Sequence, residues 1–384
     1  MKAKKILLAL ALYFSLCSLL FAVPLFSPTW GFRVDLPVCY EFVDGNGRDR
    51  FSFMNPDGAR FDIIVYHAPP GGTAPYPSLE AMVLDVQRRL NNTGSFDFFT
   101  YRGKNACLIG LSFTLGGIGE MLGWALAIEL EERAGERPLL LALAYGPAER
   151  EDLLLLHISA LDSIAPRDMD RLAPGPITEY TFPRENRIRA PIFGLGIDAW
   201  IFEEDAEAAQ YLVDREFLVL KRYQFALNWM DAWRRFYRAI YRDSFDRISD
   251  IAFQVERRIN QPGMSERDFA EQVLFWVQSF YYERDFEGSD FQNLVTAATE
   301  GRNDCDSRAM LWAIILRQAG IPSGIMVSRH YSHAMGLAYL PGEGARFEIG
   351  GVGFLVAETT ANVSIGLIAE DKSQTVYWMG ILFE

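Results

Sequence analysis

The chain has 384 residues, of which 50% are hydrophobic, 14% aromatic and 23% charged. This composition excludes an intrinsically disordered chain and supplies enough apolar surface for more than one core. At roughly 100–200 residues per domain, two or three domains are expected. The 50 acidic residues outnumber the 37 basic ones, and the net charge is −13. Nucleic-acid binding requires clustered Lys and Arg, so no nucleic-acid partner is expected.

The first 23 residues carry the pattern of an export segment. Lys2, Lys4 and Lys5 precede an apolar run from Ile6 to Val23. A basic start before a hydrophobic stretch is typical of a secretory signal peptide, and the run is also long enough for an uncleaved membrane anchor. Either interpretation predicts an exported protein, periplasmic or anchored facing outside the cytoplasm. Contact with the membrane is expected only through this N-terminal segment.

Residues 30–166 are predicted to form an α+β domain. Apolar stretches that look extended occur at 32–36, 51–54, 61–67, 106–113, 124–130 and 139–145. A helix is expected to start at Ser78, because the apolar residues after it recur at helical spacing, and a second helix is expected at 149–163. This order predicts one antiparallel sheet with helices on one face. It resembles PsbP-like domains, and we expect a binding or spacing role for this part.

Residues 167–245 are expected to connect that domain to the C-terminal one. The region begins rich in proline and glycine, looks extended at 193–202 and 211–220, and becomes helical over 221–248. An aromatic stripe lies on this helix, at Trp229, Trp233, Phe236, Tyr237 and Tyr241. Such a stripe usually faces a core. A platform for a small-molecule ligand is the alternative.

The four cysteines are Cys17, Cys39, Cys107 and Cys305. Cys17 lies in the export segment, so the exported part has three and at least one free thiol. Cys39 and Cys107 either pair in an oxidising compartment or serve as small buried hydrophobic residues.

Cys305 is predicted to lie at the start of a helix in the C-terminal domain, residues 246–384. A first helix there is expected to be capped by Ser265, with Asp268 completing the cap. The sequence 303–307, Asn-Asp-Cys-Asp-Ser, then opens a strongly apolar helix that ends at Gly320-Ile321-Pro322. Free amides and the helix dipole at a helix N-terminus favour a thiolate. The neighbouring Asp304 and Asp306 oppose it.

A cysteine nucleophile is usually paired with a histidine that a third group orients. Of the four histidines, His67 and His157 fall in the N-terminal domain, which leaves His330 and His333. His333 is expected to begin a strand, and a later strand, 352–357, ends at Glu358. Cys305, His333 and Glu358 thus follow one another in the order cysteine, histidine and acid, with His330 as the alternative base. A second cysteine pair at zinc-finger spacing is absent from the sequence, so neither a metal nor a cofactor is expected.

These motifs, in this order, resemble the transglutaminase-like superfamily, whose fold is papain-like. The resemblance covers about residues 260–365 and includes the segment around Cys305, the Gly-Ile-Pro exit, His333 and Glu358-Thr359-Thr360. It implies that Cys305 is the nucleophile, His333 the general base and acid, and Glu358 the orienting group. It also implies an oxyanion site made by the Cys305 amide with Gln278 or Tyr282. The chain departs from the family pattern at Asn303, Ser307 and Glu358, where glycine, an acidic residue and aspartate are usual.

The resemblance implies a thiol acyl-transfer enzyme that acts on amides of proteins or cell-wall peptides. Water is the default acceptor, which favours a peptidase or amidase over a cross-linking enzyme. The alternative is a non-catalytic envelope assembly module that keeps the fold and binds an envelope protein partner. The three departures from the family pattern keep this alternative open.

Overall fold

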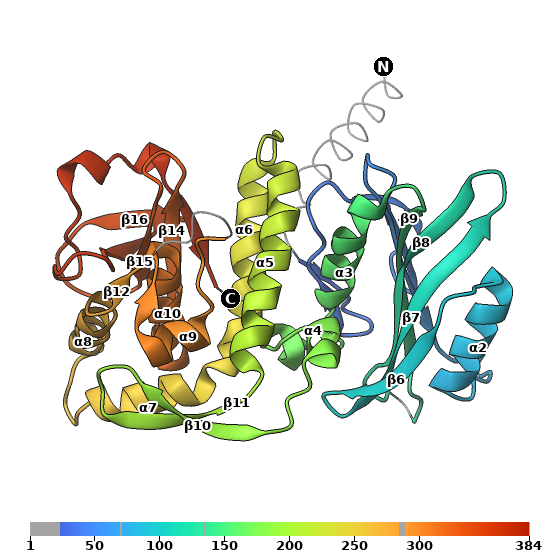
Figure 1. The fold of residues 1–384 in the computed structure, drawn as a ribbon, viewed down its shortest axis with the longest axis horizontal. Coiled ribbons are helices and arrows are strands. Elements are labelled where there is room, and N and C mark those ends of the chain that lie inside the picture. Colours follow the sequence, from blue (N-terminus) through green and yellow to red (C-terminus); the bar gives the residue numbers. More distant parts are fainter. Residues whose placement is uncertain (1–23, 70, 134, 284–288, 384) are drawn as a thin grey trace, which may run out of the picture. The chain divides into compact units, whose positions relative to one another are not determined.

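The computed structural model describes residues 24–69, 71–133, 135–283 and 289–383, and the chain divides into two compact units (Figure 1). Unit 1 takes the described part of Met1–Arg171, together with Gly175–Tyr180 and Leu218–Arg235. Unit 2 takes Leu172–Pro174, Thr181–Phe217 and the described part of Phe236–Glu384. The export segment predicted at residues 1–23 lies outside the described residues. Within the described ranges, no helix combines the length and apolar character that a membrane crossing requires.

Unit 1 is built on a seven-stranded antiparallel sheet with the order β3-β4-β5-β9-β8-β7-β6. Its strands are β3 (Glu41–Gly45), β4 (Arg50–Met54), β5 (Arg60–Tyr66), β6 (Phe96–Tyr101), β7 (Lys104–Leu115), β8 (Gly119–Glu129) and β9 (Leu139–Pro147). Two shorter strands, β1 (Leu25–Phe26) and β2 (Arg33–Val34), pair separately. The predicted α+β class is confirmed. The sequence did not indicate β3 or β6, both of which are mostly exposed and therefore lack the alternation of a half-buried strand.

Helices cover both faces of this sheet, which corrects the expectation that they share one face. Helix α2 (Leu79–Leu90), capped by Ser78, contacts β7 and β8 and shares one buried core with Leu141 and Leu143 of β9. On the same strand, Gly146 lies next to Leu153 of η1 (Glu151–Leu153) and His157 of α3 (Leu154–Asp162). Residues 141 and 143 are odd-numbered whereas 146 is even-numbered, and successive residues of a strand face opposite sides. Figure 1 accordingly shows the sheet between α2 and α3.

Residues 167–245 do not form a body of their own. They contain η2 (Asp168–Leu172), α4 (Pro176–Thr181), the hairpin of β10 (Arg187–Ile192) and β11 (Ile197–Phe202), and the helices α5 (Asp205–Tyr223) and α6 (Trp229–Arg247). The two long helices each contribute residues to both units. The expectation that 211–220 is extended is wrong, because this segment lies inside α5. Its aromatic and β-branched residues suggested a strand, yet its buried residues recur at helical spacing, at 212, 213, 219 and 220.

The two described cysteines of unit 1, Cys39 and Cys107, do not pair. Cys39, Cys107 and Cys305 are free thiols. Cys107 is fully buried in the core beneath α2, as expected of a small hydrophobic residue. Cys39 is only partly buried and its sulfur lies against the side-chain amide of Asn228.

Unit 2 packs helix α10 (Cys305–Gln318) against a five-stranded antiparallel sheet with the order β16-β17-β15-β14-β18. The strands are β14 (Ser323–Ser328), β15 (His333–Ala338), β16 (Arg346–Ile349), β17 (Val352–Ala357) and β18 (Met379–Leu382). The other helices are α7 (Ser249–Ile259), α8 (Glu266–Gln278) and α9 (Leu294–Glu300), and a short parallel pair joins β12 (Tyr281–Tyr282) to β13 (Arg302–Asn303). The short helices η3 (Glu370–Lys372) and η4 (Thr375–Tyr377) precede β18. The predicted cap on α8 is confirmed, since the Ser265 hydroxyl accepts the amide of Asp268.

Gly336 allows α10 to lie close to the sheet. A Cβ atom at this position of β15 would lie 2.4 Å from Cε3 of Trp312, a fully buried residue of α10. The Trp312 ring is also fixed at its other end, because its indole N–H donates to the Ala270 carbonyl at 3.0 Å. The ring therefore has little freedom to move away from a larger residue at 336.

We expect Gly336→Ala to lower the free energy of unfolding by about 1–3 kcal/mol, because overpacking displaces Trp312 from its site. Urea unfolding followed by tryptophan fluorescence measures this change. Gly116→Ala is the matched control, since its added Cβ would meet no atom within 4 Å. Equal stability of both variants and wild type would contradict the close packing of α10 on β15.

Candidate active site around Cys305

Cys305 is the first residue of α10, as the sequence predicts. Asp304 caps the helix, and its Oδ1 accepts the amide of Ser307 at 2.9 Å and also the Ser307 hydroxyl. Cys305 itself is only 5% exposed. Ser307, one of the departures from the family pattern, thus has a defined role in holding the cap.

Asn303, a second departure, also has a defined partner. Its side-chain oxygen accepts from Nε of Arg308 at 2.7 Å, and the same guanidinium donates to the Phe280 carbonyl at 2.7 Å. Arg308 is 1% exposed, so its charge is held inside unit 2. These bonds tie the chain just before Cys305 to the end of α8, which fixes the entry to the helix.

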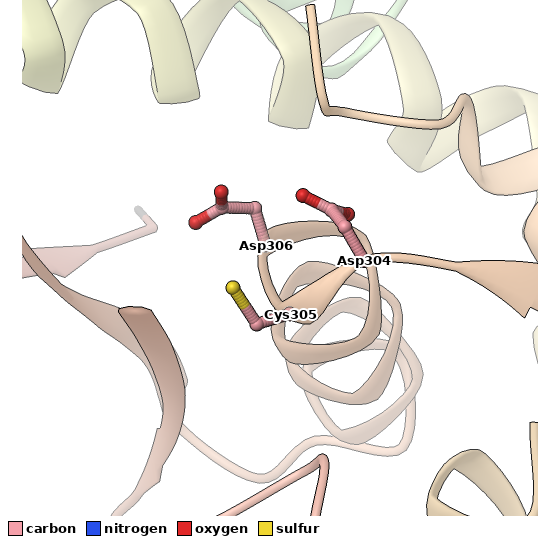
Figure 2. A group of neighbouring side chains, drawn as sticks. All are labelled: Asp304, Cys305 and Asp306. Atoms are coloured by element: carbon pink, nitrogen blue, oxygen red, sulfur yellow. The ribbon is translucent and has the colours of Figure 1, made fainter. Parts of the chain in front are cut away.

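The Cys305 sulfur lies between hydrogen-bond donors and two acids. It accepts hydrogen bonds from the backbone N–H of Ala334 and the hydroxyl of Tyr282, and both bonds lower its pKa. Tyr282 is brought there by the β12–β13 pairing, which sets it opposite Asn303. Figure 2 shows the sulfur beside the carboxyl groups of Asp304 and Asp306.

Burial and these acids nevertheless decide the ionisation of Cys305. Burial raises the pKa of the thiol most strongly, and the charges of Asp306 and Asp304 raise it further. Burial and the two acids thus oppose the thiolate that a helix N-terminus favours, as expected of the acids from the sequence. The raised pKa means that Cys305 rests as a protonated thiol.

Asp304 and Asp306 are two acids side by side. Oδ2 of Asp304 is buried and has no hydrogen-bond partner among the described residues. Burial raises the pKa of Asp304 most strongly. Burial first, and then the charge of Asp304, raises the pKa of Asp306 well above its usual value. Each acid therefore opposes ionisation of the other beside the thiol.

Tyr237 completes this acid pair and was missed at the sequence level. Its hydroxyl donates to Oδ1 of Asp306 at 3.0 Å from helix α6. Burial and the charge of Asp306 raise the pKa of Tyr237, so the phenol stays protonated and remains a donor. The sequence places Tyr237 only in an aromatic stripe. Three members of that stripe, Phe236, Tyr237 and Tyr241, are buried, which agrees with the core-facing interpretation.

The Asp304, Cys305 and Asp306 side chains are also ligand types for a divalent cation. Their ligand atoms lie within 4.8 Å of one another. Asp304 Oδ1 already accepts from Ser307 and Asp306 Oδ1 from Tyr237, so protein donors occupy one oxygen of each acid. We propose no metal for these residues.

His333 and Glu358 are brought together as predicted. His333 begins β15, Glu358 directly follows β17, and Nε2 of His333 lies 2.8 Å from Oε2 of Glu358. The amide and hydroxyl of Thr360 both donate to Oε1 of Glu358. Burial opposes ionisation of Glu358, but the bonds from His333 and Thr360 outweigh it and lower its pKa to about 2. Glu358 is therefore ionised, and its carboxylate accepts a hydrogen bond from the Nε2–H group of His333.

The structure does not join Cys305 directly to His333. In the part of the chain that the structure describes, no hydrogen bond connects the sulfur to the imidazole; the sulfur accepts instead from Ala334, the next residue along β15. Because Glu358 holds Nε2, Nδ1 is the nitrogen left for the thiol. His330, the alternative base, is exposed and stacks on the ring of Tyr377.

Gln278 supports the site in a different way from the one expected. Its amide nitrogen donates to the carbonyl oxygens of Glu358 at 2.8 Å and Val363 at 2.9 Å. Both of its N–H groups are thus engaged, which leaves none for an oxyanion. Gln278 holds the backbone that carries Glu358, whereas Tyr282 does lie beside the reacting sulfur.

Comparisons with known proteins do not identify a family. No family model matches the chain, and no curated protein matches it. Similar solved structures include a cyanobacterial PsbP (CyanoP) from Synechocystis sp. PCC 6803, at 14% identity and a TM-score of 0.28, covering 37% of this chain and 91% of that one. Another is LpqN, involved in cell envelope biogenesis of Mycobacterium tuberculosis, at 13% identity and a TM-score of 0.27, covering 37% and 90%. A Bacteroides thetaiotaomicron VPI-5482 protein matches at 10% identity and a TM-score of 0.25, covering 56% and 75%.

The first of these structures is a PsbP, the kind of protein that the N-terminal sequence pattern resembles. TM-scores this low support no argument about function, and none of the three descriptions refers to a transglutaminase-like protein.

We expect Asp306→Asn to lower the pKa of the Cys305 thiol, because it removes the neighbouring charge that contributes most to raising it. The pH dependence of iodoacetamide labelling, read at each cysteine by mass spectrometry, measures this shift. Cys107 is the internal reference, since burial raises its own pKa to about 12. Asp306→Glu keeps the acidic group, so the pH dependence of Cys305 labelling in this variant should stay nearer to that of wild type. A Cys305 profile that stays in place or moves to higher pH in Asp306→Asn would contradict the role given to this acid.

We expect the His333–Glu358 pair to stabilise unit 2 only when Glu358 is ionised. Its pKa falls from an ordinary value of 4.5 to about 2 on folding, so the contribution is complete above pH 4.5 and is lost as the pH falls toward 2. Wild type should exceed Glu358→Gln in stability by on the order of 2 kcal/mol above pH 4.5, and by less below it. Urea unfolding of both proteins between pH 2.5 and pH 7 tests this. A constant difference across that range would refute it.

Proposed function

We propose that this protein is an exported thiol acyl-transfer enzyme that cleaves amide bonds of proteins or cell-wall peptides. The observation that carries the proposal is the 2.8 Å bond between His333 and Glu358, together with the position of Ala334, the residue after His333, beside the Cys305 sulfur. A nucleophile, a base and an orienting acid on three separate elements are the requirement for this chemistry.

The proposed first step starts from the neutral thiol. Glu358 holds a proton on Nε2 of His333, so Nδ1 carries the lone pair that takes the thiol proton. The sulfur then bonds to the amide carbonyl carbon, and the carbon–nitrogen bond breaks as the His333 proton moves to the departing amine. Water, or a second amine, next attacks the resulting thioester and releases the thiol.

For this step the sulfur and Nδ1 of His333 must approach one another. Catalytic hydrogen bonds are often long in a free enzyme and shorten when the substrate binds. The Ala334 amide and Tyr282 hydroxyl, which bond to the resting thiol, would stabilise the thiolate as it forms.

The negative oxygen of the tetrahedral intermediate needs donors near Cys305. The Cys305 amide is one of the first-turn N–H groups of α10, which have no acceptor within a helix. Tyr282 supplies a hydroxyl beside the sulfur. We assign these two groups to the oxyanion and leave Gln278 out, since both its N–H groups are engaged.

The alternative is a non-catalytic envelope module, and the raised pKa of the Cys305 thiol is the observation that favours it. A module that only binds a partner has no need of a reactive thiol, and a buried neutral cysteine would serve its core well. The His333–Glu358 hydrogen bond weighs against this alternative, because a module that only binds a partner has no need of a carboxylate that orients an imidazole.

We expect Cys305→Ala to abolish hydrolysis of a pooled peptide-amide library, and Glu358→Gln to lower it by roughly 10²–10⁴-fold. The loss in Glu358→Gln follows because Gln cannot hold the His333 proton on Nε2 as a carboxylate does. Release of new amino termini measures the rate.

Cys107→Ala is the control and should keep full activity, since that thiol lies in the core of unit 1. Hydrolysis by Cys305→Ala at the wild-type rate would overturn the proposal. Absence of hydrolysis by wild type, together with a Cys305 that iodoacetamide does not label, would favour the assembly module.

A further inference from the structure

A chain of aromatic rings runs from the surface of unit 2 to His333. His330 and Tyr331 lie in the turn between β14 and β15, while Tyr377 and Trp378 lie in and after η4. The rings of His330 and Tyr377 stack, with centroids 4.1 Å apart and planes 17° apart. Tyr331 meets Tyr377 edge-on at 5.8 Å, and Tyr331 meets Trp378 at 5.4 Å.

The last contact in this chain is with the proposed catalytic base. The Trp378 ring lies 6.3 Å from the His333 ring at an angle of 64°. The exposed fraction of these residues falls toward His333, from 42% for Tyr377 to 7% for Trp378. The exposed rings are therefore connected, through the buried Trp378, to the ring of His333.

The inner part of this surface is rigid. The Trp378 indole N–H donates to the Lys372 carbonyl at 2.8 Å. Trp378 also packs in a cluster with Met326, Met335 and Leu337 of the sheet, and Tyr331 packs against the same cluster. A rigid aromatic surface binds another ring with little loss of conformational entropy.

We infer that His330, Tyr331 and Tyr377 form a substrate subsite that selects peptides with an aromatic side chain close to the scissile amide. This inference rests on the proposed function and names the substrate class for it. Aromatic rings prefer stacked or edge-on partners with centroids 4.5–7 Å apart, roughly the arrangement that these rings already make among themselves.

A peptide is favoured over a glycan because of how the polar groups are used. Sugar binding needs hydrogen-bond partners for hydroxyls beside the ring face, and the indole N–H of Trp378 is already donated to the backbone. The surface formed by His330, Tyr331 and Tyr377 consists mainly of ring faces and edges. Binding of a glycan there, in place of an aromatic peptide, would therefore overturn the inference.

The test compares the rates at which N-acetyl-phenylalanine chloromethyl ketone and N-acetyl-glycine chloromethyl ketone alkylate Cys305, read by mass spectrometry. We expect wild type to prefer the phenylalanine probe by roughly tenfold, and Tyr377→Ala and His330→Ala to lose most of that preference. Iodoacetamide, which has no side chain to recognise, should label Cys305 equally in every variant. This shows that the fold and the thiol are intact.

Val376→Ala is the matched control, since Val376 is 81% exposed beside Tyr377 and should leave the preference unchanged. Equal rates for the two probes in wild type, or a preference that survives Tyr377→Ala, overturn the subsite. Protection of Cys305 by N-acetylglucosamine oligomers but not by N-acetyl-phenylalanine amide overturns it in favour of a glycan.

A separate measurement distinguishes failure of the subsite from failure of the proposed function. Equilibrium dialysis of N-acetyl-phenylalanine amide and N-acetyl-glycine amide with Cys305→Ala measures binding without any chemistry at the thiol. If Cys305→Ala binds the phenylalanine amide selectively through Tyr377 while wild type hydrolyses no peptide, the subsite is retained and the proposed enzymatic function is rejected. Binding without selectivity would reject the subsite whatever the enzymatic result.

Discussion

The first turn of α10 buries a thiol between two acids, and the rest of the site follows from how these groups are satisfied. A buried carboxylate must find donors, and two neighbouring carboxylates cannot both stay charged at little cost. Asp304 takes donors from Ser307 in its own helix, while Asp306 takes one from Tyr237 in α6. Burial raises the pKa of both acids, so each opposes ionisation of the other. The same arrangement keeps Cys305 neutral, so its reactivity depends on a base that accepts its proton during the reaction.

The register between β15 and β17 determines where His333, the proposed base, lies relative to Glu358. β15 and β17 pair with Gly336 opposite Ala357, and continuing this register places Glu358 opposite Met335, two residues along β15 from His333. Diagonal partners in an antiparallel pair are farther apart than directly opposite ones. The longer arm of Glu358 spans this offset, and Thr360 and Gln278 hold its carboxylate and its backbone. The departure from aspartate thus fits the geometry of this sheet.

The departures at 303 and 307 have equally local explanations. Asn303 accepts from the buried Arg308, and Ser307 donates to Asp304. Each supplies a hydrogen bond that the buried first turn of α10 needs. The altered motif is therefore internally consistent, and its differences from the family pattern do not in themselves indicate a decayed site.

The sequence by itself determined the local elements of the site. Helical spacing and the residues around 303–307 placed Cys305 at a helix start, and alternation placed His333 at the start of a strand and Glu358 at the end of another. Such features depend on neighbours within a few residues, which a single sequence displays. The pairing of His333 with Glu358 followed from the family resemblance.

Only the tertiary structure decided the electrostatics and the partners. Tyr237 lies 69 residues from Asp306 in the sequence, and no local pattern connects them. Burial raises the pKa of Cys305, and this desolvation depends on every element packed around the sulfur, including β15 and the β12–β13 pair. Likewise, Gln278 was assigned to the oxyanion from its place in the sequence, whereas the loop after β17 engages both of its N–H groups. Long-range packing sets these properties, and the sequence pattern does not contain it.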